Sequence, residues 1–558
     1  MKIHFCGACK TVTGSSFLVE TSSRRILIDC GMFQGSKILK ELNYGAFPFD
    51  PSTIDAVLLT HAHIDHSGLI PKLVKAGYKG PIYATPETTE FCSISLPDSG
   101  YIQEMEIARK NRKRQRQNLP SLEPIYTAED ANNSLDFFVP VDYKKEIVLS
   151  ENISAQFFDA GHILGSAHIL LTIADGDETK KVVFSGDIGS DDKPYVEDPT
   201  VIENPDIIIM ETTYGRKTHS AKTNKLELLA EIINKAYKKG GNIIIPAFAI
   251  ERTQDLLFYL QQLKNENKIP VLPIYIDSPL AISATKIFRE NPQNFDEEST
   301  RLIKIGLNPL TAENVYFSHT TEDSIRLNTT SGAIIISASG MADAGRIKHH
   351  LKHNLWRSDS TVLFVGYQAE GTLGRRLIDG AKEVTIHGER ISVNADIINL
   401  PGFSSHADQN ELLRWINTSC SNLRGIFLVH GEEMAMNVFS DVLQKEKGIT
   451  PIIPELGEVV EFVNNQIIRN IPEKPWLKLV EEKLSASISK EEDVLRNLIA
   501  KNLSRTKGIT LSEVNYAYDK LKKDLREFIN VTKKERDYNY LYSVIDSVAQ
   551  ILEEAKKR

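Results

Sequence analysis

Apolar residues in the first 210 positions occur as short runs separated by polar turns. Runs of four to six apolar residues bounded by turn residues are typical of buried strands. The runs lie at 14–20, 25–29, 56–60, 169–173, 181–185 and 206–210. This pattern predicts a strand-rich amino-terminal region.

Helical periodicity becomes clear only after residue 220. Apolar positions recur at helical spacing over 225–238 and 252–263. Strand-like runs alternate with them at 242–246, 271–276, 333–337 and 361–366. Such alternation is typical of a doubly wound α/β unit. Strands with histidine-bearing ends return after residue 391, so we expect one domain to be inserted into another.

The carboxyl-terminal segment has a different character. The Pro-containing link 471–475 precedes a tail rich in Lys, Glu and Leu. Apolar residues recur there at helical spacing, as Leu511, Val514, Tyr518, Leu521 and Leu525 and again as Leu541, Ile545, Val548 and Leu552. We expect a helical module that docks onto a second copy or a partner protein. The predicted domains are 1–212, 213–390, 391–470 and 476–558.

Composition narrows the class of protein. The 558 residues are 41% hydrophobic and 25% charged, as in ordinary globular enzymes. The formal net charge of −8 excludes a globally basic nucleic-acid coat. No apolar run reaches the roughly 18 residues of a membrane span, and the amino terminus has no secretory signal pattern. Five cysteines are too few for a disulfide framework, which favours the cytoplasm.

A cluster of metal-ligating residue types follows the strand at 56–60. His61, His63, Asp65 and His66 fall within six positions. Imidazole nitrogens and carboxylate oxygens are the ligands that zinc takes besides thiolates. Tight turns can direct His61 and His63 to one ion, and Asp65 and His66 to another. The alternative is a histidine-rich surface loop, which the adjoining apolar strand argues against.

Three further candidates also stand beside apolar runs. They are His162, Asp187 and His430, each flanked by small residues that allow close approach of backbone or substrate. Any one of them alone is more typical of a buried histidine or a turn aspartate. Together with the cluster at 61–66 they favour a metal site.

The order of these residues resembles a known family. Asp29, the segment 61–66, His162 and Asp187 resemble the metal motifs of the metallo-β-lactamase superfamily. Glu211, His406 and His430 resemble those of the β-CASP nucleases. The resemblance spans residues 1–468, including 246–254 and 366–374, and is nearest to the cleavage-and-polyadenylation endonuclease and its bacterial and archaeal relatives.

The resemblance implies an α/β fold, an αββα metallo-β-lactamase sandwich with an inserted doubly wound β-CASP domain. It also implies two zinc ions per chain. The first would be held by His61, His63 and His162, the second by Asp65, His66 and His430, with Asp187 bridging both. Asp29 would orient a ligand or the water from behind.

The implied activity is hydrolysis of single-stranded RNA by a hydroxide shared between the zinc ions. The resemblance also implies a catalytic function for Asp65. His406 would protonate the leaving 3′ oxygen, with Glu211 orienting its ring, to give 5′-phosphate and 3′-hydroxyl ends. The histidine at position 430 is a further point of resemblance to the RNA-cutting members of this family. Internal and 5′-exonucleolytic cutting both stay open.

Weaker features concern substrate contacts. Four basic residues, Arg109, Arg112, Lys113 and Arg116, share one face of a predicted helix. They form either a phosphate-contacting arm or a solvated face balanced by preceding glutamates. Ser404 is either a phosphate donor or a turn serine. Gly340 is either part of a phosphate cradle or a tight turn.

Two other functions are compatible with the same scaffold. A hydrolase of small esters or thioesters would not need a proton donor delivered by an inserted domain, such as His406. A non-catalytic scaffold subunit would be expected to have lost ligands, whereas this chain has the complete set.

Overall fold

The computed structural model of the chain describes residues 1–478, except 117, 176–177, 219–224, 367, 369–370, 401, 417–422, 464–465, 475 and 477. The predicted carboxyl-terminal helical module, apart from Trp476 and Lys478, therefore lies outside the described residues. Its apolar stripes and its predicted partner remain predictions.

Two sheets built from both ends of the described chain form a sandwich. The first has the order β22 (Gln466–Asn470), β21 (Val459–Val463), β1 (Lys2–Phe5), β2 (Phe17–Glu20), β3 (Arg25–Ile28), β4 (Ala56–Leu58), β5 (Ile82–Ala84), β6 (Phe138–Pro140). The second has the order β20 (Gly425–Val429), β11 (Ile207–Glu211), β10 (Glu178–Phe184), β9 (Ala167–Asp175), β8 (Ile153–Asp159), β7 (Ile147–Ser150). All six strand runs predicted before residue 211 are found here.

Alternating burial explains why these strands face one another. In β1 and β8 every second side chain is buried, as expected for strands with one face on a core. Ile3, Phe157 and Phe427 belong to one apolar cluster that draws on both sheets. Helices cover the outer faces: α1 (Lys37–Leu42), α2 (Ile64–Ser67), α3 (Ile70–Lys75), α4 (Pro86–Gln115), α5 (Ala128–Leu135), α13 (Gln409–Trp415) and α14 (Glu433–Lys447). The predicted αββα sandwich is confirmed.

A third, all-parallel sheet forms from the middle of the chain. Its order is β14 (Val315–Phe317), β13 (Ile274–Ile276), β15 (Ile334–Ser337), β12 (Ile243–Pro246), β16 (Thr361–Phe364), β19 (Asp396–Asn399). Its central strands β12, β15 and β16 are buried on both faces, which explains their continuous Ile- and Val-rich sequences. We call residues 225–399 the inserted unit.

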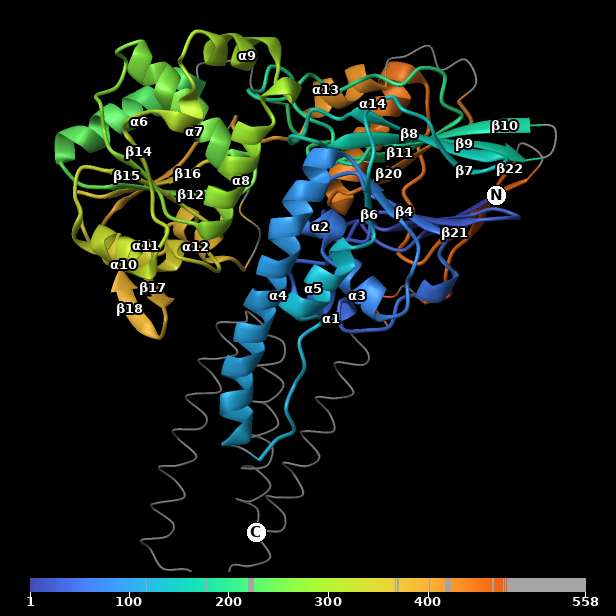
Figure 1. Cartoon of the computed structure of the whole chain (residues 1–558), viewed down its shortest axis with the longest axis horizontal. Helices are drawn as coiled ribbons and strands as arrows, with labels where there is room; N and C mark the ends of the chain where they lie inside the picture. The colour runs from blue at the N-terminus through green and yellow to red at the C-terminus, as the bar shows by residue number, and fades with distance from the viewer. Residues whose placement is uncertain are drawn as a thin grey trace, which may run out of the picture. The chain divides into compact units, whose positions relative to one another are not determined.

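Helices cover both faces of the inserted unit's sheet (Figure 1, green to yellow). They are α6 (Lys225–Lys239), α7 (Arg252–Asn265), α8 (Pro279–Glu290), α9 (Glu297–Lys304), α10 (Thr321–Arg326), α11 (Ile347–Asn354) and α12 (Leu373–Ile378). A separate hairpin joins β17 (Glu383–Ile386) to β18 (Glu389–Ser392). The predicted doubly wound arrangement is confirmed. Within the described ranges, no helix has both the length and the apolar composition of a membrane span.

The sheet of the inserted unit extends past the predicted domain boundary at residues 390–391. The strand β19 pairs in parallel with β16, with Asp396 opposite Thr361. Sheet membership depends on a partner 35 positions away in the sequence, so we place the return after residue 399.

Candidate metal centre

The candidate ligands converge because they follow different strands of the sandwich. His61 and His63 lie between β4 and α2, and His63 is the N-cap of that helix. His162 lies between β8 and β9, Asp187 follows β10, and His430 follows β20. The turn that carries the cluster needs a glycine opposite it. A Cβ added to Gly31 would lie 1.7 Å from the Asp65 carbonyl oxygen.

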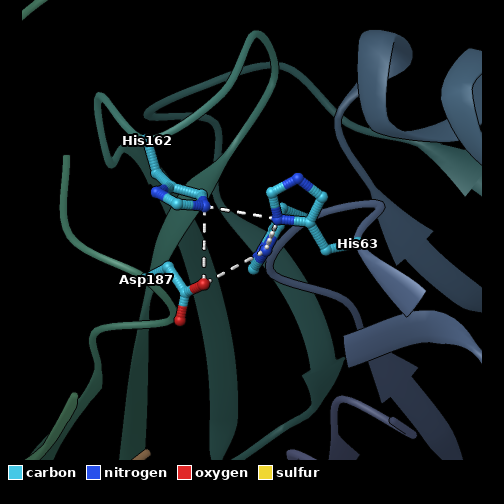
Figure 2. Close-up of side chains that lie close together, drawn as sticks. His63, His162 and Asp187 are labelled. Atoms are coloured by element: carbon cyan, nitrogen blue, oxygen red, sulfur yellow. Dashed lines mark hydrogen bonds and ion pairs between the residues drawn. The ribbon is translucent and has the colours of Figure 1, made fainter. Parts of the chain in front are cut away.

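The first ligand group contains His61, His63, His162 and Asp187. His63 Nδ1 lies 3.1 Å from His61 Nε2 and 3.3 Å from His162 Nε2. Asp187 Oδ2 lies 3.5 Å from His61 Nε2 and 3.4 Å from His162 Nε2 (Figure 2). Four ligands at zinc–nitrogen distances of about 2.0–2.1 Å form a tetrahedron with edges of about 3.3 Å. These separations therefore fit a single tetrahedral ion.

The second ligand group contains Asp65, His66 and His430. His66 Nε2 lies 3.2 Å from His430 Nε2, and His430 Nε2 lies 3.5 Å from Asp65 Oδ2. The other oxygen of Asp187, Oδ1, lies 3.2 Å from His66 Nε2. One carboxylate thus directs one oxygen to each group, as a bridging ligand would.

The electrostatics of the first group suit metal binding. Burial lowers the pKa of His63 to about 4 and the pKa values of His61 and His162 well below 6.5. The imidazoles are therefore neutral, the form that ligates metal. Burial raises the pKa of Asp187, but the neighbouring His430, His66 and His406 lower it by more. The net effect places the pKa well below its usual value, so this carboxylate is ionised.

Asp29 lies behind the second group rather than in it. Its Oδ2 lies 2.7 Å from His66 Nδ1, and its Oδ1 accepts a hydrogen bond from the Thr60 amide at 2.8 Å. Ser15 Oγ also donates to it, at 3.1 Å. These contacts fix the His66 ring with Nε2 toward His430, so an orienting function for Asp29 fits this geometry.

His406 and Glu211 form a pair at the edge of the first group. His406 Nδ1 lies 3.1 Å from Glu211 Oε1 and 3.9 Å from Asp187 Oδ2. Glu211 is fully buried and also accepts a hydrogen bond from the Ile188 amide at 2.6 Å. Burial lowers the pKa of His406, but Glu211 and Asp187 more than offset this effect and raise it to about 9. The pair can therefore hold a proton beside the ligand groups.

The four basic residues predicted to contact substrate lie at one end of α4. The basic residues Arg109, Arg112, Lys113 and Arg116 lie exposed at the carboxyl-terminal end of α4 or at its C-cap. The other end of α4 contacts the His162 loop, because Thr85 and Thr88 donate to the Gly165 carbonyl at 2.6 and 2.8 Å. At 1.5 Å per residue, Arg109 is about 36 Å along the helix from that loop.

Ser404 and Gly340 have local structural contacts. Ser404 Oγ accepts a hydrogen bond from the His406 amide at 3.2 Å, as a turn serine does. Gly340 is buried, and a Cβ there would lie 2.8 Å from the Phe248 ring. Both observations support the turn interpretations, and the phosphate contacts stay predictions.

Sequence reasoning assigned no function to Lys193, Glu251 or Arg252. Lys193 donates to the carbonyl of His162 and lies 2.9 Å from Glu251. Arg252 donates to Ser405, the neighbour of His406. The only sequence signal was that Glu251 and Arg252 fall within the 246–254 segment that carries the family resemblance.

Models of three protein families match the chain. Residues 10–236 match the metallo-beta-lactamase superfamily, and residues 253–377 match the Beta-Casp domain. Residues 390–454 match the Zn-dependent metallo-hydrolase RNA specificity domain.

Individual relatives are similar over most of both chains. Ribonuclease TTHA0252 of Thermus thermophilus is 37% identical over 434 residues, which cover 78% of this chain and 94% of the relative. Transcription termination factor FttA of Methanosarcina mazei is 33% identical, covering 82% and 71%. An RNase J-like protein of Methanocaldococcus jannaschii is 30% identical, covering 82% and 99%. The chain therefore belongs to the β-CASP ribonucleases, metal-dependent hydrolases of the metallo-β-lactamase superfamily.

Proposed function

We propose that this chain is a zinc ribonuclease that hydrolyses phosphodiester bonds of single-stranded RNA. The observation that carries the proposal is the His406–Glu211 pair beside two ligand groups that share Asp187. His61, His63 and His162 would hold one zinc ion, and Asp65, His66 and His430 the other. Two such ions, when bound, supply Lewis acidity that activates water and neutralises phosphate charge.

The residues around the ligand groups supply the remaining chemistry. Direct attack by water on phosphorus expels the 3′ oxygen, which needs a proton. His406 Nδ1 faces Glu211, so the opposite ring nitrogen, Nε2, would deliver that proton. Asp29 would keep the His66 ring in its ligating orientation. The products would be a 5′-phosphate and a 3′-hydroxyl.

The choice of RNA rests on the relatives and not on the chemistry, because water attack does not use the substrate 2′-hydroxyl. One relative is named a ribonuclease and another RNase J-like, and the matched carboxyl-terminal family is described by RNA specificity. His430 agrees with this choice by family resemblance. Basic residues at the end of α4 would hold RNA far from the cut. The local contacts of Ser404 and Gly340 favour turn functions for both residues.

Purified protein and end-labelled single-stranded RNA test the proposal. Cleavage should require zinc, stop with a chelator, and leave 5′-phosphates. Fragments ending in 2′,3′-cyclic phosphates would contradict the mechanism, because they arise from attack by the substrate's own 2′-hydroxyl. Hydrolysis of small esters or thioesters without RNA cleavage would support the small-substrate alternative, and zinc-loaded protein without any hydrolysis would support the scaffold.

A further inference from the structure

Two consecutive residues at the start of α7 contact the two loops that carry His162 and His406. Glu251 is the N-cap of α7 and Arg252 is its first residue. Both belong to the inserted unit, whereas both loops belong to the sandwich. The contacts are buried, since Glu251 is 1% and Arg252 6% exposed.

Glu251 reaches the His162 loop through an ion pair. Its Oε1 lies 2.9 Å from Lys193 Nζ, and that ammonium also donates to the His162 carbonyl. Glu251 Oε2 accepts a hydrogen bond from the Leu164 amide at 3.4 Å. Lys193 is only 7% exposed, so this network is shielded from solvent. One carboxylate of the inserted unit thus holds the backbone of the His162 loop at two points, the Leu164 amide directly and the His162 carbonyl through Lys193.

Arg252 reaches the His406 loop. Its Nη2 donates to Ser405 Oγ at 3.0 Å, and its Nη1 donates to Asp255 Oδ2 at 2.9 Å. The Ser405 carbonyl in turn accepts a hydrogen bond from the Ser190 amide at 3.0 Å. The guanidinium fork therefore fixes the residue directly before His406.

The backbone between these two side chains is strained. Glu251 has φ 72° and ψ −62°, and the Arg252 amide donates to the Ile250 carbonyl across it at 3.0 Å. This γ-turn is the rare form for a residue with a Cβ. Such strain persists where the surroundings fix the residue, and it concentrates at functional sites.

The loop that carries Lys193 is also anchored in the inserted unit. The fully buried ring of Tyr195 lies 5.5 Å from Phe258 and 4.9 Å from Phe295, measured between centroids. The Tyr195 amide donates to Asp296 Oδ1 at 2.9 Å. Lys193 therefore meets Glu251 in a fixed geometry.

We propose that Glu251, acting through Lys193, and Arg252 are positioning residues that fix His162 and His406 relative to each other. Competence for cleavage then depends on the inserted unit being docked through these two contacts. The inference rests on the proposed function, because it takes His162 as a metal ligand and His406 as the proton donor.

The test compares variants of the full chain loaded with zinc. In the paired Lys193→Met, Glu251→Gln variant, which leaves no unpaired buried charge, zinc transfer to a chromophoric chelator should be roughly 10–100-fold faster. In Arg252→Lys, which keeps the charge but loses the fork, zinc transfer should match wild type while kcat falls and KM stays constant. The control is Glu90→Ala, which removes a 2.8 Å contact between α4 and Asn291 but touches neither loop. It should leave both quantities unchanged.

Wild-type zinc transfer and kcat in the paired variant would overturn the inference. So would equal zinc loss in Arg252→Lys or in Glu90→Ala, since that would indicate general loosening. If the paired variant does not fold, Glu251→Asp provides the same test with a smaller acceleration, and an unchanged rate there would overturn it. A wild-type protein without bound zinc or RNA cleavage would contradict the proposed function itself.

Discussion

His406 and His430 lie 24 positions apart in the sequence, and different neighbouring side chains favour a different function for each. His406 faces the carboxylate of Glu211 at 3.1 Å, whereas His430 Nε2 faces His66 Nε2 at 3.2 Å. The Glu211 carboxylate, within hydrogen-bond distance, favours a proton on His406 Nδ1. His430, in contrast, belongs to a group of three possible metal ligands with Asp65 and His66. The two side chains are therefore proposed as proton donor and metal ligand.

Replacing each histidine separates these functions. His406→Ala should keep two zinc ions and lower the cleavage rate by about 10²–10⁴-fold, because general acid assistance is lost. His430→Ala should lose zinc as well as activity. Elemental analysis and single-turnover RNA cleavage measure both quantities.

A sulfur leaving atom in place of the 3′ oxygen provides the control. Sulfur needs little protonation, so this substrate should partly rescue His406→Ala and not His430→Ala. Equal rescue of the two variants, or zinc loss in His406→Ala, would show that the proton donor is misassigned.

Glu211→Gln should shift the pH dependence of the rate. Glu211 raises the pKa of His406. Because the protonated form of His406 is the proposed proton donor, activity should fall as the pH rises through that pKa. Without the carboxylate, the alkaline limb of the pH–rate profile should move to lower pH. An alkaline limb at the wild-type position would contradict the assignment of Glu211.

The residues that bear chemistry were predictable where they cluster in sequence. Four of the candidates lie within 61–66, and their proximity in sequence already required proximity in space. Lys193 and Arg252 gave no such signal, since lysine and arginine are normally exposed. Their importance depends on burial and on contacts 58 and 153 positions away, which only the assembled fold supplies.

At the scale of elements, α4 joins two distant regions. One end contacts the His162 loop through Thr85 and Thr88, and the other end carries the exposed basic face. About 36 Å of helix separates them. Any RNA contact at the basic end therefore concerns nucleotides far from the cut.

Removing one charge from this face should weaken binding only of long RNA. Lys113→Ala should raise KM for long substrates and make the salt dependence of binding shallower by about 0.7 in log–log slope, as expected for one lost phosphate contact. The shortest RNA that is cleaved should be unaffected. Filter binding across a salt series measures the slope.

Lys110→Ala is the matched control, because Lys110 is equally basic and exposed but lies off the shared face. Identical effects of both variants would indicate a general charge effect and contradict a specific RNA-binding face.

The inserted unit has a buried ionic cluster that should govern its stability. Asp277, directly after β13, lies 2.7 Å from Arg346 Nη1 and 2.5 Å from His350 Nε2. Burial raises the pKa of Asp277, but hydrogen bonds from His350 and Ser324 lower it below its usual value. A lowered folded-state pKa stabilises the protein above the unfolded pKa of about 3.9, and this stabilisation is lost on acidification.

Asp277→Asn should therefore cost about 3–5 kcal/mol near pH 7, because it leaves the half-buried guanidinium of Arg346 without its countercharge. The difference from wild type should shrink below about pH 4. Thermal unfolding at both pH values measures it. Asp396→Asn, which removes a surface pair with Lys239, should cost less than about 1 kcal/mol, and an equal loss in both variants would contradict the account.

Element types were more predictable than sheet membership. The apolar runs at 242–246 and 333–337 became β12 and β15, and the helical periodicity at 225–238 became α6. Periodicity reports which face of a segment is buried, but not against which partner. This is why the order β13–β15–β12 could not be derived from local pattern.

At the scale of the whole described molecule, one apolar cluster includes residues of both the sandwich and the inserted unit. Phe91 of α4 lies 5.7 Å from Phe288 of α8, and Tyr195 lies 5.6 Å from the same ring. The unit is therefore packed against the sandwich, which agrees with the proposal that its docking positions the loops of His162 and His406.

The central claim is that two ligand groups sharing Asp187 hold two zinc ions. The most direct measurement is elemental analysis of zinc per chain after reconstitution and removal of free metal, on wild type and Asp187→Ala. The account predicts close to two zinc ions in wild type. It predicts a marked loss in Asp187→Ala, because the two cations would repel across a short gap without the bridging carboxylate. Fewer than one zinc in wild type, or unchanged binding in Asp187→Ala, would contradict it.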